Sequence, residues 1–525
     1  MTTALLHPRD LNLPPKFSSW RPGQLDSILS AFDAFDTSRF LASNDPTGAG
    51  KSVKAAALAQ LLGERAVIVT STKNLQSQYS NDFRPMGIAD VRGRNNYSCD
   101  DYGTCAEGRL LGCEANREGN CEYVNDLNHF LTSPLGVTNY SYMLSSRLHG
   151  AAKDGIGDVG LLVLDEAHNA VQELSDALEI HLDHNKLAPF YANTVPHPPR
   201  GRALQWWQEW AKACLAPMAK CVEGLKATKN KKLVVAADSF SSQLIKISNL
   251  APDWIVDDVT SKTETVFAPL WPTDQAKPLL FSKAAHVLLM SATIVPKTLQ
   301  LLGVEESEST FLSSTFNFPR HRCPIYLFGG DRIDHRTTEA QYQAQLGRMD
   351  SLISHRLDRK GIIHSVSYER QQFIKSRSAH SAIMLAPRAK ELASAIELFK
   401  SSPPPLILVS PAITTGYDFP GVDAEYQFIM KVPFLDLRGP IMKARSEDDP
   451  EYAMYLTIQT LIQMCGRLMR GPEDSSETFI LDKHINWLLL SPDRGGKYRH
   501  LFTPWFLNLI QWPKVQPQPL PKLAA

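Results

Sequence analysis

Short runs of branched apolar residues recur along the chain and alternate with segments of helical periodicity. Most of these runs are apolar at nearly every position, which is typical of parallel strands that are buried on both faces of a sheet. Because helical segments separate the runs, we predict an α/β protein with two parallel-sheet units. The predicted strands of the first unit are 66–70, 136–138, 161–164 and 286–290, and those of the second are 361–363, 406–409, 427–431 and 478–481.

Two stretches interrupt this alternation. Residues 93–132 are rich in Gly, Asn, Cys and charged side chains and contain no clear strand. Residues 169–280 are predicted to be mainly helical, and Trp206, Trp207 and Trp210 recur there at helical spacing. Aromatic residues at this spacing more often pack in a core than stack on bases, so we interpret them as the core of an insert.

The composition limits the class of protein. The chain has 525 residues, 43% of them apolar, which is enough for several domains. Lys plus Arg and Asp plus Glu number 55 each, so net charge gives no support to nucleic-acid binding, although a local basic groove would suffice for it. No apolar run approaches the roughly 18 residues of a membrane span, and the start of the chain lacks the pattern of a secretory signal. We therefore expect no membrane partner and a cytoplasmic location, associated with the nucleoid in a bacterium.

The first candidate motif is Gly-Ala-Gly-Lys-Ser at 48–52, which follows an extended stretch and begins a helical segment. Backbone N–H groups of such a loop, together with the helix N-terminus, bind phosphate. Lys51 would contact the β- and γ-phosphates of a nucleotide, and Ser52 would ligate Mg²⁺. Asp45 replaces the usual first glycine of this motif, and a Gly-Lys-Ser turn by itself also occurs in ordinary loops.

A second candidate motif, Asp-Glu-Ala-His at 165–168, follows the predicted strand 161–164. At the end of a strand, Asp165 would hold Mg²⁺ and Glu166 could polarise the attacking water as general base. An acidic strand end is often merely solvated. The order of the two motifs, each after a strand, favours a nucleotide site instead.

A third motif near the end of the chain is Gln-Met-Cys-Gly-Arg-Leu-Met-Arg at 463–470. Arg467 and Arg470 lie three residues apart, so a helix would place them on one face. Two guanidinium groups there could stabilise the charge that develops on a γ-phosphate. Taken alone, this segment would more simply be a basic helix face exposed to solvent.

Four cysteines lie between the first two motifs with the spacing Cys-x5-Cys-x7-Cys-x7-Cys. In a chain with no export signal, thiols or metal ligands are more common than disulfides. Zinc sites usually contain Cys-x2–4-Cys pairs, whereas four cysteine thiolates with less regular spacing also hold [4Fe–4S] clusters. The spacing alone leaves an iron–sulfur cluster, zinc and inert thiols open for Cys99, Cys105, Cys113 and Cys121.

The ordered set of motifs resembles superfamily 2 helicases and, more closely, the XPD/DinG family, over roughly residues 17–485. Gly-Lys-Ser, Asp-Glu-Ala-His, Ser-Ala-Thr and Gln-x-x-Gly-Arg-x-x-Arg occur in the order of that superfamily. Cysteines placed between the strand-gripping motif and the acidic motif are similar to the cluster-bearing insert of the XPD/DinG family. Further segments similar to family motifs are Arg-Pro-Gly-Gln at 21–24, 70–78, Gly-Arg-Asn-Asn-Tyr-Ser-Cys at 93–99, Val-Thr-Asn-Tyr at 137–140, 416–421 and 431–434.

The resemblance implies an α/β fold with two RecA-like parallel-sheet motor domains and, in the first, an iron–sulfur insert and a small helical arch-like insert. The expected division is motor domain 1 at 1–92, 133–170 and 279–312, the iron–sulfur insert at 93–132, the arch-like insert at 171–278, motor domain 2 at 313–510 and a proline-rich flexible tail at 511–525.

The resemblance also implies the site residues. Ser291 and Thr293 would couple hydrolysis to domain movement, and Gln24 would select adenine. The implied catalytic residues are Lys51, Asp165, Glu166, Gln463, Arg467 and Arg470. The implied ATP contacts are Gln24, Thr47, Gly48, Ala49, Gly50, Lys51, Ser52, Gly416 and Asp418. The implied metal ligands are Ser52 and Asp165 for Mg²⁺, and Cys99, Cys105, Cys113 and Cys121 for a [4Fe–4S] cluster.

The implied function is an ATP-dependent 5′→3′ DNA helicase that translocates on single-stranded DNA and unwinds forked duplex DNA. RNA or a DNA–RNA hybrid stays open as a substrate. One alternative is a nucleic-acid-stimulated ATPase that remodels complexes without processive unwinding. Another is a single-strand-binding scaffold with a decayed ATPase, against which the intact Lys51, Glu166, Arg467 and Arg470 argue.

Overall fold

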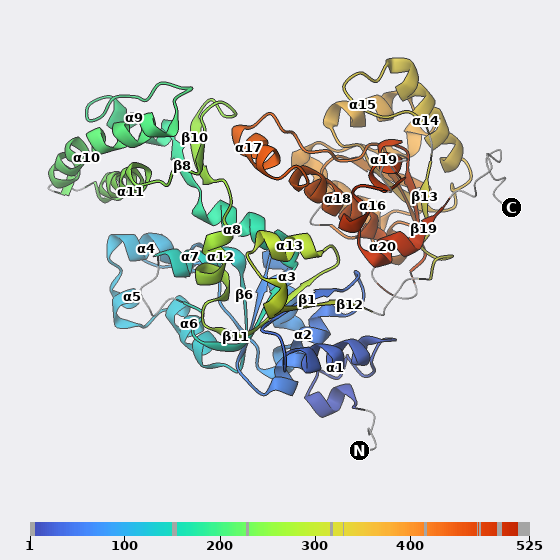
Figure 1. Cartoon of the computed structure of the whole chain (residues 1–525), viewed down its shortest axis with the longest axis horizontal. Helices are drawn as coiled ribbons and strands as arrows, with labels where there is room; N and C mark the ends of the chain where they lie inside the picture. The colour runs from blue at the N-terminus through green and yellow to red at the C-terminus, as the bar shows by residue number, and fades with distance from the viewer. Residues whose placement is uncertain are drawn as a thin grey trace.

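The computed structural model of the chain describes residues 6–149, 155–226, 230–314, 319–328, 330–413, 417–469, 471, 474–490 and 496–512. Figure 1 shows two α/β units, one mainly blue to cyan at the bottom and one gold to red at the upper right. A group of green elements lies at the upper left. We call the two α/β units domain 1 and domain 2.

Domain 1 is built on a seven-stranded parallel sheet with the strand order β12-β1-β11-β7-β2-β6-β3. Phe40 and Ala42 of its strand β1 join one hydrophobic core and Leu41 joins another, so the sheet is buried on both faces. The strands are β1 (Phe40–Asn44), β2 (Ala66–Thr70), β3 (Ala89–Asp90), β6 (Leu135–Asn139), β7 (Val159–Asp165), β11 (Ala284–Ser291) and β12 (Ser309–Ser313). The helices are α1 (Gln24–Ala34), α2 (Lys51–Leu62), α3 (Lys73–Asp82), α7 (Tyr140–His149), α8 (Ala170–Leu178), α12 (Thr273–Ala276) and α13 (Pro296–Leu301).

Domain 2 repeats this plan with a second seven-stranded parallel sheet, in the order β15-β16-β14-β17-β18-β13-β19. Its strands are β13 (Ile325–Leu327), β14 (Lys360–His364), β15 (Met384–Leu385), β16 (Leu406–Ser410), β17 (Tyr426–Ile429), β18 (Glu477–Ile480) and β19 (Ile510–Gln511). Its helices are α14 (Glu339–Ile353), α15 (Tyr368–Arg377), α16 (Leu392–Ser401), α17 (Pro440–Asp448), α18 (Tyr452–Cys465), α19 (His484–Leu490) and α20 (Pro504–Leu509).

The predicted α/β architecture with two parallel sheets is confirmed. Each of the eight predicted strands overlaps an observed one, and the predicted bounds of 66–70 match β2. The inner strand β13 and the edge strands β3, β12, β15 and β19 were not predicted, and β1 was expected only as an extended stretch before the phosphate loop. Three of the edge strands contain only two residues, a length too short to show a pattern of its own.

The cysteine-containing stretch forms a small helical unit beside domain 1, with one short hairpin. Strands β4 (Ser98–Cys99) and β5 (Gly103–Thr104) pair antiparallel. The helices α4 (Cys105–Leu111), α5 (Glu114–Glu118) and α6 (Glu122–Thr132) follow, and Figure 1 shows them together at the left of domain 1.

The second insert contains more than helices. Its helices are α9 (His184–Tyr191), α10 (Leu204–Lys226) and α11 (Lys231–Ser248). A three-stranded sheet accompanies them, in which β10 (Glu264–Pro269) pairs antiparallel with β8 (Ile180–Asp183) and β9 (Trp254–Asp257). The sequence did not predict this sheet. Trp207 and Trp210 are buried in the core of the insert, as predicted.

Domain 2 contacts the base of this second insert through α17, which Figure 1 shows close to β10. Arg445 of α17 is 2% exposed. Its guanidinium donates to the Leu270 carbonyl oxygen at 2.8 Å, to Ser175 Oγ at 2.6 Å and to the Pro269 carbonyl oxygen at 3.1 Å. In the part of the chain that is described, no helix combines the length and apolarity that crossing a membrane would require.

Candidate functional site: a nucleotide cleft between two α/β domains

The phosphate loop connects the carboxyl end of β1 to the start of α2. Gly48 and Gly50 have φ values of +83° and +85°, a conformation that favours glycine. A Cβ at Gly50 would lie 2.2 Å from Gln24 Nε2, so a side chain there would displace the Gln24 amide from the loop. The loop thus presents its backbone at the N-terminus of a twelve-residue helix, the arrangement that binds phosphate.

Gln24 lies against this loop. Its Nε2 donates to the Gly50 carbonyl oxygen at 3.2 Å, and its Oε1 accepts from the Arg21 backbone N–H at 3.0 Å. The Arg21 guanidinium also donates to the Gly48 carbonyl oxygen. The segment predicted to contact adenine is therefore fixed to the phosphate loop.

Asp45, the residue that departs from the usual motif, forms a buried ion pair with Lys54 of α2. Both side chains are 3% exposed, with 3.3 Å between Nζ and Oδ2. Lys54 Nζ also donates to Ser43 Oγ at 2.6 Å and to Ser27 Oγ at 2.8 Å. The substitution thus provides a carboxylate for a lysine buried under the loop. Lys54 was not singled out from the sequence.

Asp165 is the last residue of β7, Glu166 follows it, and both line one cavity with the phosphate loop. Asp165 accepts from Tyr79 Oη–H at 2.8 Å and from the Glu166 backbone N–H at 2.9 Å. Burial, and then the charge of Glu166, raise the pKa of Asp165 to about 6. Glu166 has φ +50°, and its Oε1 lies 4.0 Å from Lys51 Nζ. Tyr79 was not predicted, because its contact joins residues 86 positions apart.

His168 links the two domains. Its Nε2 lies 2.5 Å from the amide nitrogen of Gln463 in α18, and its Nδ1 lies 2.6 Å from Ser291 Oγ and 3.3 Å from Glu166 Oε2. Burial lowers the pKa of His168 to about 4, so the ring is neutral near pH 7. Since an amide nitrogen only donates, we assign Nε2 as the acceptor and place the ring proton on Nδ1.

Arg467 approaches the same cleft from domain 2, from a 3-10 turn that follows α18. Helix α18 ends at Cys465, a 3-10 turn covers Gly466–Leu468, and Met469 is extended. The α-helix therefore ends before Arg467, and the other arginine of the predicted pair, Arg470, is not among the described residues. Arg467 Nη1 lies 3.3 Å from Asp418 Oδ1. Gly416 also lies outside the described residues.

Most of the predicted ATP-site residues line two adjacent cavities that share Glu166. The first, of about 590 Å³, is lined in part by Gln24, Gly48, Gly50, Lys51, Ser52, Asp165 and Glu166. The second, of about 300 Å³, is lined in part by Thr47, Glu166, His168, Asp418, Gln463, Arg467 and Trp505. Ala49 lies within the loop and is buried. Asp418, Gln463 and Arg467 come from domain 2, so the second cavity lies between the two domains.

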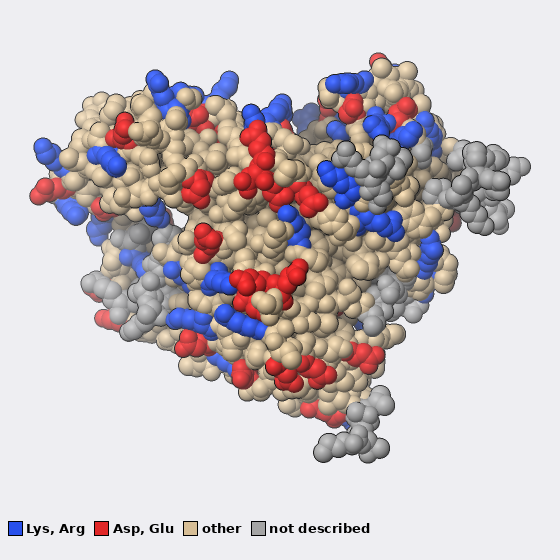
Figure 2. Space-filling view, viewed as in Figure 1, with Lys and Arg blue, Asp and Glu red and all other residues tan. Residues whose placement is uncertain are grey.

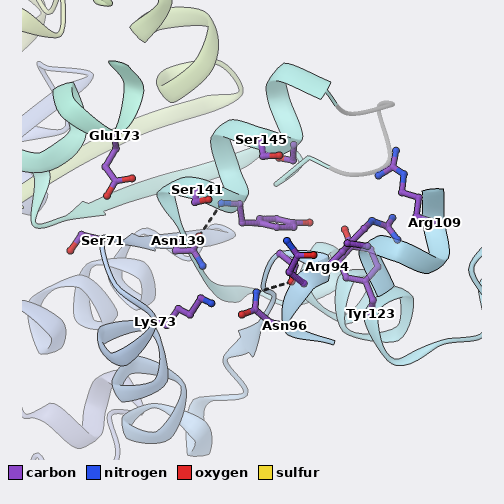
Figure 3. Close-up of a pocket in the computed structure, with 15 residues that line it drawn as sticks. Ser71, Lys73, Arg94, Asn96, Arg109, Tyr123, Asn139, Ser141, Ser145 and Glu173 are labelled. Atoms are coloured by element: carbon purple, nitrogen blue, oxygen red, sulfur yellow. Dashed lines mark hydrogen bonds between the residues drawn. The ribbon is translucent and has the colours of Figure 1, made fainter. Parts of the chain in front are cut away.

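A third hollow, of about 700 Å³, lies between domain 1 and the cysteine-containing unit. Figure 3 shows Lys73 of α3, Asn139 of β6, Arg94 and Arg109 around it. Its remaining labelled residues are Ser71, Asn96, Tyr123, Ser141, Ser145 and Glu173. On the molecular face in Figure 2, Lys and Arg are interspersed with Asp and Glu. The lining of this hollow, by contrast, concentrates basic and amide side chains on a protein of zero formal net charge.

The four predicted cysteine ligands approach one another in pairs. A Cβ on Gly108 would lie 3.3 Å from Cys99 Sγ and 3.2 Å from Cys113 Cβ. Cys105 lies within hydrogen-bond reach of Cys121, and burial raises the pKa of Cys105 while the nearby Arg94 opposes that change. Within the described ranges, no three His, Cys, Asp or Glu side chains form a group with metal-binding geometry.

Comparison with known proteins finds two matching families and a curated relative. Residues 353–491 match the family described as the helicase C-terminal domain, and residues 18–191 match the family described as the type III restriction enzyme, res subunit. The ATP-dependent DNA helicase YoaA of Escherichia coli (strain K12) is 24% identical over 242 residues, or 43% of this chain. The match spans only 38% of the length of YoaA.

Two solved structures share the fold over nearly the whole chain. An XPD helicase aligns over 90% of this chain and 97% of its own, with a TM-score of 0.60 and 14% identity. The Xpd4 protein of S. tokodaii aligns over 91% and 99%, also with a TM-score of 0.60 and 14% identity. These alignments show two RecA-like domains. Together with the family matches and the ordered motifs, they lead to one conclusion: the chain is similar in fold and in motif order to helicases of the XPD/DinG type.

Proposed function

We propose that this protein is an ATP-dependent DNA helicase that translocates 5′→3′ on single-stranded DNA and unwinds duplex DNA. The observation that carries the proposal is the cavity shared by Glu166 of domain 1 and Gln463 and Arg467 of domain 2. A γ-phosphate bound there would contact both domains, so its cleavage would change how strongly they attract each other. The match to the DNA helicase YoaA supports DNA as the substrate.

In the proposed reaction, the phosphate loop and Lys51 bind the ATP phosphates. Glu166 orients a water molecule for in-line attack and accepts its proton, since its carboxylate borders both cavities. Arg467 stabilises the charge on the transferred phosphoryl group. Ser52 and Asp165 line the same cavity and offer oxygen ligands that suit Mg²⁺. When bound, Mg²⁺ would neutralise phosphate charge.

We propose the hollow of Figure 3 as part of the path of the single strand. Lys73, Arg94 and Arg109 would contact phosphates, and Asn and Ser side chains would contact sugar and phosphate oxygens. Such contacts carry little sequence information, as expected of a translocating enzyme. The assignment of residues 93–132 and 171–278 as inserts beside this path, and the other domain boundaries given above, belong to the same proposal.

We also propose that Cys99, Cys105, Cys113 and Cys121 hold a [4Fe–4S] cluster. Four thiols within one small unit fit the ligand chemistry of a cluster, and Gly108 leaves between Cys99 and Cys113 a space that a Cβ would fill. The cluster would stabilise a unit with few apolar residues. Anaerobically purified protein should contain about four irons with acid-labile sulfide. One zinc per chain, or no metal, would contradict this part of the proposal.

Unwinding of forked duplexes tests the function. With ATP and Mg²⁺, a duplex with a single-stranded tail at a 5′ end only should be unwound, and a duplex with a tail at a 3′ end only should not. Lys51→Ala should abolish both unwinding and ATP hydrolysis. Hydrolysis stimulated by single-stranded DNA without strand separation would favour the alternative of a translocase that remodels complexes, and separation of the 3′-tailed fork would contradict the proposed direction.

A further inference from the structure

Trp505 of α20 lies near the C-terminal end of the sequence of domain 2, and its side chain contacts the nucleotide cleft. Its indole Nε1–H donates to the Ala292 carbonyl oxygen of domain 1 at 2.7 Å. The side chain is 4% exposed and borders the cavity shared by Glu166, Gln463 and Arg467. It lies beyond the segment 353–491 that matches the helicase C-terminal domain family.

Domain 2 holds this indole firmly. The strand after α20, β19, pairs with β13 in the sheet of domain 2, with Ile510 opposite Ile325. The Trp505 ring also packs on Phe506, which is fully buried, with 6.2 Å between ring centroids. The indole therefore moves with the sheet of domain 2, and its hydrogen bond to domain 1 depends on how closely the two domains approach.

The carbonyl that Trp505 binds belongs to a peptide group with a second partner. The Ala292 C=O and the Thr293 N–H lie in one rigid plane, and this N–H donates to Ser291 Oγ at 3.0 Å. Ser291 Oγ in turn lies 2.6 Å from His168 Nδ1. A hydrogen bond to the Ala292 carbonyl oxygen therefore also fixes the orientation of the Thr293 N–H. This N–H orients the Ser291 hydroxyl, which contacts His168.

His168 lies beside the proposed general base, with 3.3 Å between Nδ1 and Glu166 Oε2. A continuous set of contacts therefore runs from domain 2 to Glu166 through the indole, the Ala292–Thr293 peptide, Ser291 and His168. Asn44 of domain 1 also donates to the Ala292 carbonyl oxygen, but at 3.4 Å. Trp505 provides the shorter of these two bonds, and the one that links this carbonyl to domain 2.

We infer that Trp505 is a positioning residue for ATP hydrolysis: its N–H fixes the Ala292–Thr293 peptide when the domains close and so holds Ser291 and His168 in the arrangement that supports Glu166. The inference rests on the proposed function, since it assumes ATP hydrolysis in this cleft. Trp505 would not touch the reacting atoms. Its loss should therefore lower turnover without removing ATP binding.

Trp505→Phe tests the inference, because it keeps the packed aromatic ring and removes only the donor. Loss of one neutral hydrogen bond should lower DNA-stimulated ATP turnover about three- to tenfold, with KM for ATP within about twofold of wild type. The matched control is Trp210→Phe, which removes an indole donor to the Pro196 carbonyl oxygen within the second insert and should leave turnover unchanged. Unchanged turnover in Trp505→Phe, with an active wild type, would overturn the inference.

A double variant separates positioning from general stability. If Trp505 acts through Ser291, Trp505→Phe added to Ser291→Ala should lower turnover little further, because both changes interrupt one set of contacts. Fully additive losses, or a fall in turnover that tracks a lower thermal midpoint in both tryptophan variants, would contradict the inference. A wild-type protein that hydrolyses no ATP would instead contradict the proposed function.

Discussion

Single residues around the phosphate loop explain how the chain departs from the usual phosphate-loop motif at Asp45 and still forms the loop. Asp45 stands where the motif usually has glycine, and the structure pairs it with Lys54 and surrounds that lysine with two serine hydroxyls. A buried lysine without a carboxylate would be costly. The two residues therefore form one unit under the loop.

Breaking this pair should destabilise domain 1. Lys54→Met leaves the Asp45 carboxylate buried without its partner, so we expect a loss of about 3 kcal/mol in the free energy of unfolding, measured from the denaturant midpoint. Adding Asp45→Ala should restore most of it. Arg377→Ala, which breaks a pair whose side chains are 56% and 70% exposed, serves as the control and should cost less than about 1 kcal/mol. A double variant no more stable than Lys54→Met would contradict this account.

The pKa of Asp165 predicts a pH dependence of stability in the metal-free protein. Because burial and Glu166 raise the pKa of Asp165 from 3.8 to about 6, the folded state binds this proton more tightly than the unfolded state. The stabilisation of the folded state by this bound proton is therefore complete below about pH 4 and is lost as the pH rises through 6.

Asp165→Asn removes this titration. In EDTA at pH 7.5 the variant should be more stable than wild type, on the order of 2 kcal/mol, and the difference should shrink toward pH 5. Thermal midpoints of both proteins across this range give the measurement. The variant should also lose Mg²⁺-dependent hydrolysis. Equal thermal midpoints of the variant and wild type at pH 5 and at pH 7.5 would show that the buried Asp165 carboxylate does not destabilise the protein.

At the scale of elements, prediction succeeded where a run of apolar residues or a motif is local. Eight of the fourteen described strands of the two parallel sheets were predicted from such runs, and the phosphate loop and the acidic motif occur at strand ends as predicted. In the sheet β8-β10-β9, the pairing of β8 was missed because it spans a long separation, with Glu264 opposite Asp183. The end of α18 at Cys465 was missed because helical spacing alone does not fix where a helix stops.

No local sequence pattern predicts the contact of α17 with the second insert. Its contribution to stability can be tested by mutation. Arg445→Leu removes three hydrogen bonds from a buried guanidinium, so we expect faster amide exchange in β10 and α8 and a loss of about 2–4 kcal/mol in stability. Lys443→Ala changes a neighbouring residue whose side chain is 65% exposed and should have no such effect. Protection of β10 at the wild-type level in Arg445→Leu would exclude a structural role for this junction.

At the scale of the whole molecule, two parallel-sheet domains close around one cleft, and residues from both reach it. The approach is close: a Cβ on Gly466 of domain 2 would lie 3.4 Å from Thr47 Oγ1 in the phosphate loop. The sequence predicted which residues would meet here, because their motifs occur in a fixed order. It did not predict Tyr79, Lys54 or Trp505, whose contacts depend on tertiary packing and follow no short motif.

The proposed function requires that both domains together form one ATP-hydrolysing site. Arg467 belongs to domain 2 and the phosphate loop to domain 1, so single-turnover ATP hydrolysis on single-stranded DNA by Arg467→Ala tests this requirement. We predict that the rate constant for hydrolysis falls by at least about 10³-fold while ATP affinity stays within about threefold. Hydrolysis at the wild-type rate in this variant would contradict the account.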